Sequence, residues 1–384
     1  PGVSALGERV DAVPAPAAGT HERIHYLDNL RALAMFAGVL FHASLAYSPL
    51  MHPFWVTADR GQWVGVDIAV WFLHLFRMPL FFVIAGFFAA WQVARRGVGG
   101  LLRNRAARVL LPLVVFWPLV SVSIDWLTGQ AALMVEQASP VLEFIRDNPL
   151  LTLPPSLAHL WFLYYLMWFY LLVWIATTAE WKVDAGRVLA WPVLGLVGVA
   201  PLLLVPALVS VSAPTPAPES FLPQLWALVY YGLFFAFGYG LHARPQWLTG
   251  IRPIAPGLLL ASLAAYIAFL WILGNCSTDS LFHIGAAALQ ACVSVWMTLW
   301  CLQTGSAWLG ARVGWLRYLS DASYWTYLVH LPVLFAIQYP LMDLELAWPI
   351  KWAISVGVTL VLCLGSYHLA VRKTLIGRLL NGRR

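Results

Sequence analysis

Apolar residues along this 384-residue chain gather in runs of about 20 residues, and short polar or basic stretches separate the runs. A helix of about 20 residues is about 30 Å long, which matches the hydrocarbon core of a bilayer. The pattern therefore predicts an all-α fold, a polytopic transmembrane helical bundle of about ten spans. The predicted limits of the spans are residues 28–48, 64–91, 109–127, 158–179, 188–211, 222–242, 254–274, 281–303, 318–340 and 350–371.

The composition excludes a soluble domain. Hydrophobic residues make up 61% of the chain and charged residues only 10%, whereas about a quarter of the residues of soluble proteins are charged. The net charge of +6 does not indicate nucleic-acid binding, because the basic residues lie between apolar runs and not in one patch. We therefore expect membrane lipids around the protein and no nucleic-acid partner.

The distribution of lysine and arginine predicts the orientation of the bundle. If the N-terminus is inside, three of the 23 basic residues fall outside, two lie within spans, and the other 18 fall on the inner side. The outer three are Arg60, Arg146 and Lys351, and the two within spans are Arg31 and Arg77. Because cytoplasmic loops carry an excess of Lys and Arg, both termini are predicted to be cytoplasmic.

Three regions follow from this assignment. Residues 1–25 are rich in Ala, Pro and Gly and are predicted to form a disordered cytoplasmic tail. Residues 26–372 form the transmembrane domain, and residues 373–384 form a basic cytoplasmic tail. His21 and His25 have a spacing compatible with metal binding, but in such a tail exposed histidines are expected, so no metal site is predicted.

Arg31 and His42 mark the working face of the first predicted span. Eleven residues separate them, which is three helical turns plus about 20°, so both point to one side of the helix and lie about 16 Å apart along it. Polar groups of this kind are costly inside a membrane and usually face a functional interior. Asp28, one turn before Arg31, is in position to pair with it.

Two further spans place polar side chains at a similar depth. His74 and Arg77 lie in the second predicted span, and His330 lies near the middle of the ninth. For His74 and His330, a functional role and a simple hydrogen bond to a neighbouring helix are both open. Arg77 keeps its proton and needs an anionic or polar partner, which is either a substrate or a structural ion pair.

The loop from Arg95 to Arg108 carries the densest positive charge in the chain. Such a loop fixes topology and touches anionic lipid. Arg105 and Arg108 are three residues apart and would share one face at the inner mouth of the third span, an arrangement that suits a cytoplasmic donor bearing phosphate groups.

At these residues the chain resembles the acyltransferase-3 family of membrane acyltransferases. Its motifs run over nearly all of the transmembrane domain. They are Leu27-Asp28-Asn29-Leu30-Arg31 through His42, Phe76-Arg77-Met78-Pro79-Leu80-Phe81-Phe82-Val83-Ile84-Ala85-Gly86, Arg105-x-x-Arg108, His159-Leu160-Trp161-Phe162-Leu163, and Ser323-Tyr324-Trp325-Thr326-Tyr327-Leu328-Val329-His330-Leu331-Pro332.

The resemblance implies a bacterial inner-membrane enzyme with an acyl-CoA donor on the cytoplasmic side and a glycan hydroxyl as acceptor outside. The motifs look most like the branch that succinylates periplasmic glucans, which implies succinyl-CoA as co-substrate and no permanently bound cofactor. His42 is then the expected general base, with Arg31 beside the donor arm and CoA phosphates at Arg105 and Arg108. An acyl-histidine intermediate is the competing route.

The resemblance leaves the roles of some residues open. Arg77 or His74 is expected either to bind the far carboxylate of a succinyl group or to steady the developing oxyanion. Two other functions also stay open, an O-acetyltransferase of another cell-surface glycan and a transporter that moves a glycan or lipid without making a bond. A homo-oligomer is compatible with the sequence, which does not fix the oligomeric state.

Overall fold

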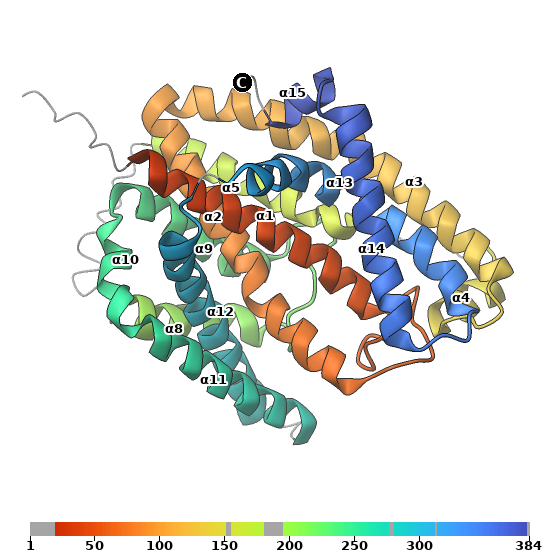
Figure 1. Cartoon of the computed structure of the whole chain (residues 1–384). Coiled ribbons are helices and arrows are strands. Elements are labelled where there is room, and N and C mark those ends of the chain that lie inside the picture. Colours follow the sequence, from red (N-terminus) through yellow and green to blue (C-terminus); the bar gives the residue numbers. More distant parts are fainter. Residues whose placement is uncertain (1–19, 151–154, 180–194, 276–279, 312, 382–384) are drawn as a thin grey trace, which may run out of the picture.

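The computed structural model describes residues 20–150, 155–179, 195–275, 280–311 and 313–381. Within these ranges all regular elements are helical, as the apolar runs predict (Figure 1). The elements are α1 Thr20–Leu45, α2 Val64–Arg105, the π-helix η1 Ala106–Leu110, α3 Leu111–Met134, α4 Pro140–Asp147, the 3-10 helix η2 Ala158–Leu160, α5 Trp161–Thr178, the π-helix η3 Gly195–Val199, α8 Ala200–Val209, α9 Leu225–Ala243, α10 Gln246–Ile251, the 3-10 helix η4 Arg252–Ile254, α11 Ala255–Asn275, α12 Ser280–Trp308, α13 Gly314–Met342, α14 Trp348–Ser366, the π-helix η5 Tyr367–Val371 and α15 Leu375–Asn381.

Six helical segments in the described ranges are long and apolar enough to cross a membrane. Helices α1 and α13 are also longer than 25 residues but contain more polar residues and are less apolar, so they do not belong to this set. The predicted span 188–211 is described only as Gly195–Val209. The number of ten spans therefore stays a prediction. The six segments are Val64–Met134, Ala158–Thr178, Leu225–Ala243, Gln246–Asn275, Leu281–Trp308 and Trp348–Val371.

The basic stretch from Arg95 to Arg108 is helical, although the sequence favoured a loop. A single residue, Gly97, leaves the helical conformation, with φ +66° and ψ 174°. Glycine reaches positive φ without steric cost, so this one residue can turn the chain within α2. After the turn, the helix continues through η1 into α3 (Figure 1). The turn keeps Arg105 and Arg108 on helical backbone.

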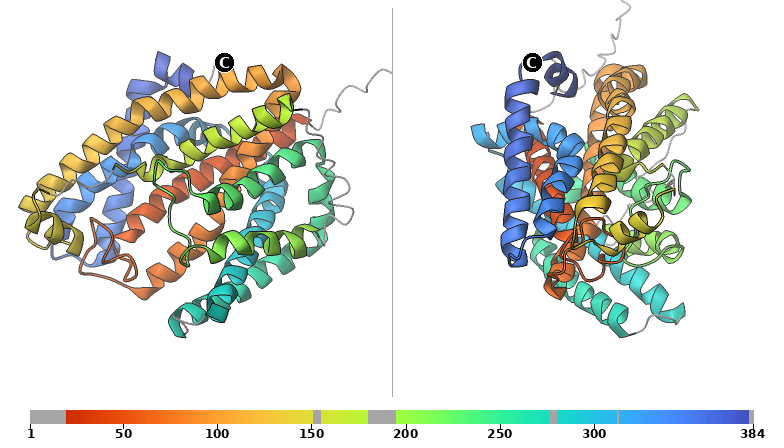
Figure 2. Two further views of the ribbon diagram at one scale, coloured as in Figure 1. Left: turned by 180° about the vertical axis from the view of Figure 1, so that it is seen from behind. Right: turned by 90° about the vertical axis from the view of Figure 1, so that its right-hand side faces the viewer.

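Helix α1 runs through the middle of the bundle (Figures 1 and 2). It packs against α2, α12, α13 and α14. Helix α2 packs in addition against α9, where Gly86 faces the Phe235 carbonyl and Gly238 faces the Val83 carbonyl so closely that a Cβ at either glycine would collide with it. Small residues permit this approach between helices in a membrane. Helix α2, which carries Arg77, is thereby held close to α9.

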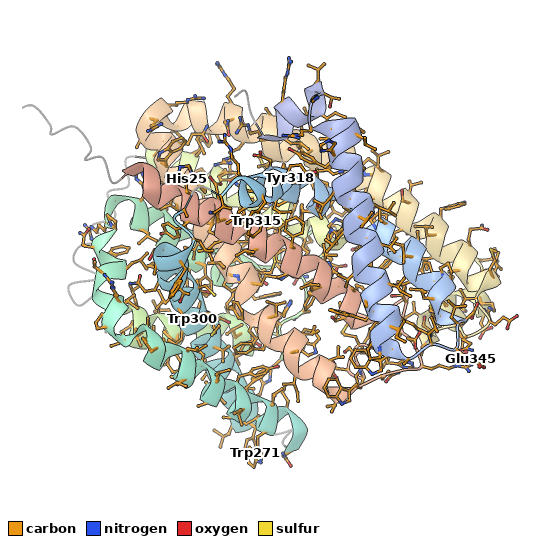
Figure 3. All side chains as sticks on the ribbon, viewed as in Figure 1. His25, Trp271, Trp300, Trp315, Tyr318 and Glu345 are labelled. Atoms are coloured by element: carbon orange, nitrogen blue, oxygen red, sulfur yellow. The ribbon has the colours of Figure 1, made fainter. Side chains whose placement is uncertain are left out.

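Both ends of the described chain lie at one end of the bundle. His25 of α1 and Leu380 of α15 line the same cavity. We call this the basic end. At the opposite end α1 stops at Leu45, and Figure 3 places Trp271 and Glu345 far from His25. The predicted tails 1–25 and 373–384 fall partly outside the described residues.

A loop of residues 46–63, which we call the cap, closes the bundle opposite the basic end. Its Asp59 carboxylate lies 2.7 Å from the Lys351 ammonium of α14, and both side chains are less than 7% exposed. Its Thr57 hydroxyl donates to the side-chain carbonyl of Gln338 over 2.7 Å. The cap is therefore fixed by buried polar contacts to α13 and α14.

The buried ion pair gives a stability prediction. Lys351→Met leaves the Asp59 carboxylate buried without its cation, and we expect a loss of about 3–5 kcal/mol in the free energy of unfolding. The double variant Asp59→Asn with Lys351→Met removes both charges and should recover most of that loss. Thermal unfolding in detergent measures both. Equal losses in the single and double variants would show that the pair does not anchor the cap.

Candidate active site

The centre of the candidate site is a pair of histidines from α1 and α13. His42 Nδ1 lies 2.9 Å from His330 Nε2, and the two rings stack with centroids 5.1 Å apart. His42 stands in the last turn of α1, and His330 is buried in the middle of α13. Residues 288 positions apart in the chain therefore share one hydrogen bond.

The partners of His330 fix which nitrogen atoms carry protons. His330 Nδ1 lies 2.8 Å from the Tyr327 carbonyl and 3.1 Å from the Thr326 carbonyl. A carbonyl only accepts, so in a neutral ring His330 Nδ1 donates and Nε2 accepts from His42 Nδ1. His42 Nε2 then carries a lone pair, as a general base or nucleophile requires.

Aromatic rings hold His42 in this position. Trp55 of the cap lies parallel to the His42 ring, with centroids 6.3 Å apart and planes 7° apart. Phe41 contacts His42 edge-on at 5.2 Å. The imidazole is only partly buried, unlike His330. It therefore lies between the cap and the interior of the bundle.

His159 is a third member of this cluster, and the sequence singled it out only as part of a family motif. Its ring lies 4.9 Å from His330 and 6.4 Å from His42, measured between centroids. It is 5% exposed, and neither ring nitrogen makes a well-aligned hydrogen bond, although the backbone of Tyr327 and Leu328 lies close to the ring. Unsatisfied buried polar atoms are rare and often mark functional sites. The sequence contains one indication of such a role, because His159 is a polar residue at the start of an apolar run, near its predicted outer end.

The backbone before His159 is strained. Ala158 has φ +46°, which is uncommon for a residue other than glycine. The Tyr327 hydroxyl donates to the His159 carbonyl over 2.8 Å and holds the segment in place. Strain of this kind gathers at functional sites, where the surrounding structure maintains it.

His74 does not join the histidine cluster. Phe41 separates it from His42, with the Phe41 and His74 rings stacked at 5.2 Å. His74 Nε2 lies 3.0 Å from the Thr215 carbonyl, and Thr215 is itself held by the Gln290 side chain. His74 Nδ1 is buried without a partner.

Arg77 lies over the Phe41 ring. Its guanidinium carbon is 4.8 Å from the Phe41 ring centroid, a cation–π contact. The side chain is 7% exposed. Of the four groups predicted at similar depth, His42 and His330 share a hydrogen bond, and Phe41 contacts His42, His74 and Arg77.

A cavity of about 850 Å³ opens at the basic end, within the size range of ligand-binding pockets. Asp28, Arg31, Arg105 and Arg108 line it, as the sequence predicted for a donor site. The wall contains six arginines and two aspartates, so its net charge is positive. The charged residues that the sequence did not assign to it are Arg95, Arg96, Arg317 and Asp321.

Contacts in the wall hold two of these arginines in place. Arg31 Nη2 lies 3.3 Å from Asp28 Oδ1, so the predicted pair is present, with both side chains more than a third exposed. The Arg105 guanidinium packs over Tyr170 at 5.0 Å. Both guanidinium groups keep donors for a ligand, because one acidic partner or one ring does not use all five N–H groups.

The cavity ends one or two helical turns short of the histidines. Its deep wall contains Met35, Phe81 and Tyr327. Tyr327 precedes His330 by one turn and contacts both the His159 and the His330 rings. None of the three histidines of the cluster lines the cavity. Within the described residues, no group of three His, Cys, Asp or Glu side chains fits a metal ion.

The unpaired nitrogens of His159 give a second stability prediction. His159→Leu removes two buried unsatisfied polar atoms, so we expect the free energy of unfolding to rise by about 1–3 kcal/mol. His74→Leu is the matched control, because it removes a ring that has a partner and should lower stability. Thermal unfolding in detergent measures both variants. A lower unfolding temperature for His159→Leu would show that its ring is a structural part of the core.

The chain is similar to one known protein family and to several named proteins. A family described as "Acyltransferase domain" matches residues 24–368. Proteins named "Glucans biosynthesis protein C" from Salmonella heidelberg, Salmonella typhi and Salmonella typhimurium are 25% identical over 333 residues, covering 84% of this chain and 84% of each relative. No solved structure matches the chain. The resemblance read from the motifs is confirmed, and the chain belongs to the acyltransferase-3 family of membrane acyltransferases.

Proposed function

We propose that this acyltransferase moves a succinyl group from succinyl-CoA on the cytoplasmic side to hydroxyl groups of a periplasmic glucan. The observation that carries the proposal is the lone pair on His42 Nε2, left open because His42 Nδ1 donates to His330. The arginine-lined cavity supports a phosphate-bearing donor at the basic end. The name of the Salmonella relatives supports a glucan acceptor.

The proposed setting is the bacterial inner membrane, crossed about ten times, with both termini cytoplasmic. The excess of Lys and Arg on one side supports this orientation. So does the position of α1 and α15, which line one cavity at the basic end. In this setting the cap faces the periplasm.

The donor lies along the cavity with its phosphates at Arg105 and Arg108. Arg31, on the same stripe of α1 as Met35 and His42, guides the pantetheine arm inward. The Tyr327 ring must turn aside for the thioester to reach His42, because it stands in the deep wall. This rotation breaks the hydrogen bond between the Tyr327 hydroxyl and the His159 carbonyl.

The transfer requires one base and one acid, and His42 serves as both. Its Nε2 takes the proton of the sugar hydroxyl as that oxygen attacks the thioester carbon. The tetrahedral intermediate collapses, the carbon–sulfur bond breaks, and the CoA thiolate takes the proton back from His42. His330 holds the imidazole in the required tautomer throughout, since its Nδ1 stays bonded to backbone carbonyls.

Removal of the base tests the reaction. His42→Asn keeps a side-chain amide near His330 and should lower transfer by at least about 100-fold. The assay follows free CoA thiol released in the presence of both succinyl-CoA and glucan, with membrane insertion checked for each variant. A transporter releases no thiol. Thiol release at the wild-type rate in His42→Asn would remove the proposed base.

The arginines of the cavity give a separate prediction about donor binding. Arg105→Gln with Arg108→Gln should weaken CoA binding by at least about 100-fold, because two charged hydrogen bonds are lost and each is worth about 1.5–3 kcal/mol. Arg103→Gln is the matched control, since Arg103 is exposed and does not line the cavity. Binding of CoA to the purified protein measures both. Equal affinity in the double variant and the control would contradict the donor site.

A further inference from the structure

His159 lies one turn beyond the last residues of α5 that line the cavity. The cavity-lining face of α5 begins at Tyr170, which contacts Arg105 at the basic end, and continues through Leu166 and Leu163 to Phe162. His159 precedes Phe162 by three residues and Leu163 by four, so it takes the next place on this face. It is the polar end of an otherwise apolar stripe that leads away from the basic end.

The cavity-lining faces of α13 and α1 continue in the same way. Tyr327 of α13 lines the cavity, and His330 follows it by three residues. Met35 of α1 lines the cavity, and His42 follows it by two turns. The centroids of the His42, His159 and His330 rings lie between 4.9 and 6.4 Å apart. Three helices that line the donor cavity therefore converge on one cluster of imidazole rings.

The Tyr327 ring stands between the cavity and His159. It belongs to the deep wall, and it contacts the His159 ring edge-on with centroids 5.4 Å apart. The rotation of Tyr327 that admits the thioester therefore uncovers His159 at the same time.

His159 is the member of the cluster whose hydrogen-bonding groups are not yet assigned. His330 donates through Nδ1 and accepts through Nε2, and His42 keeps its Nε2 lone pair for the acceptor hydroxyl. His159 is 5% exposed, and neither of its ring nitrogens makes a well-aligned hydrogen bond. A neutral imidazole has one N–H donor and one lone pair. The N–H group of His159 is therefore available to a ligand that reaches the cluster.

We infer that His159 is a further catalytic residue, whose N–H group donates to the thioester carbonyl oxygen and stabilises the negative charge that forms there. The inference rests on the proposed function. As the sugar oxygen bonds to the thioester carbon, the carbonyl electron pair moves to the oxygen and the sugar proton goes to His42 Nε2. His159 keeps its own proton. When the carbonyl re-forms, the carbon–sulfur bond breaks and the thiolate takes the proton from His42.

The distance between the two rings fits this division of roles. In the tetrahedral intermediate, the attacking oxygen and the charged oxygen are bonded to the same carbon atom. One hydrogen bond of about 2.8 Å on each side then places the nitrogens of the base and of the donor about 5–8 Å apart. The His42 and His159 ring centroids are 6.4 Å apart, with an interplanar angle of 68°. The two rings can therefore contact one reacting carbonyl group from different sides.

Infrared spectroscopy of bound succinyl-CoA tests the hydrogen bond without requiring turnover. A heavy-isotope label in the thioester carbonyl separates its stretching band from the amide bands. We expect this band at lower frequency in the wild type than in His159→Leu, because a donated hydrogen bond weakens the C=O bond. His159→Asn is the matched variant, since asparagine has nearly the shape of leucine but keeps an N–H donor, and it should retain the low frequency.

Turnover tests the catalytic role of the same group. His159→Leu should lower kcat for thiol release by about 100- to 1,000-fold, the range for loss of one oxyanion donor. The affinity for free CoA should stay unchanged, because free CoA has no thioester carbonyl. The loss should be the same at every pH, since His42 still takes the proton. His159→Asn should recover part of the rate.

Three results would overturn the assignment. One is the same carbonyl frequency in His159→Leu and the wild type. The second is an equal loss of kcat in His159→Leu and His159→Asn with a lower unfolding temperature for both, which would make the ring a structural part of the core. If His159→Leu does not fold, the wild type alone decides, because a bound carbonyl band at the frequency seen in an aprotic solvent removes the hydrogen bond.

The two readouts separate this inference from the proposed function. A carbonyl shift that depends on His159, without thiol release in the presence of glucan, keeps the contact with His159 and removes the transferase. Thiol release that requires His42 but not His159 keeps the transferase and removes the role of His159.

Discussion

The hydrogen bond between His42 and His330 is the constraint on which the arrangement of the site depends. It joins the last turn of α1 to the middle of α13, and its direction follows from the carbonyls that accept from His330. Because α1 also contacts α2, α12 and α14, a shift of α1 would move Arg31 and His42 together. One face of α1 thus carries Arg31, which lines the cavity, and His42, which binds His330, in a fixed order along the helix.

The parts of the site that repeat with helical period were predictable from the sequence. Arg31 and His42 share a face by spacing alone, and Asp28 pairs with Arg31 as an i, i+3 neighbour. The contacts of His159 and Trp55 were not predictable, because they join a 3-10 helix and a loop to residues far away in the chain. Periodicity describes one helix at a time and carries no information about such contacts.

For the basic stretch before α3, local composition favoured a loop, and this prediction was wrong. Three glycines and five arginines from Arg95 to Arg108 resemble a loop, yet the chain stays helical except at Gly97. Glycine costs a helix only about 1 kcal/mol per residue, a cost that neighbouring apolar residues offset by packing. The fold class and the membrane character followed from hydropathy, whereas the path of the chain at this turn required the structure.

The wall at the deep end of the cavity has a consequence for the permeability of the membrane. Met35, Phe81 and Tyr327 stand between water at the basic end and the histidines near the cap. In the proposed reaction only the thioester end of the donor crosses this wall, and the bulky nucleotide stays at the basic end. If the wall closes again behind the departing thiol, the proposed transfer leaves no continuous water path across the bundle, and the ion gradients of the membrane are preserved.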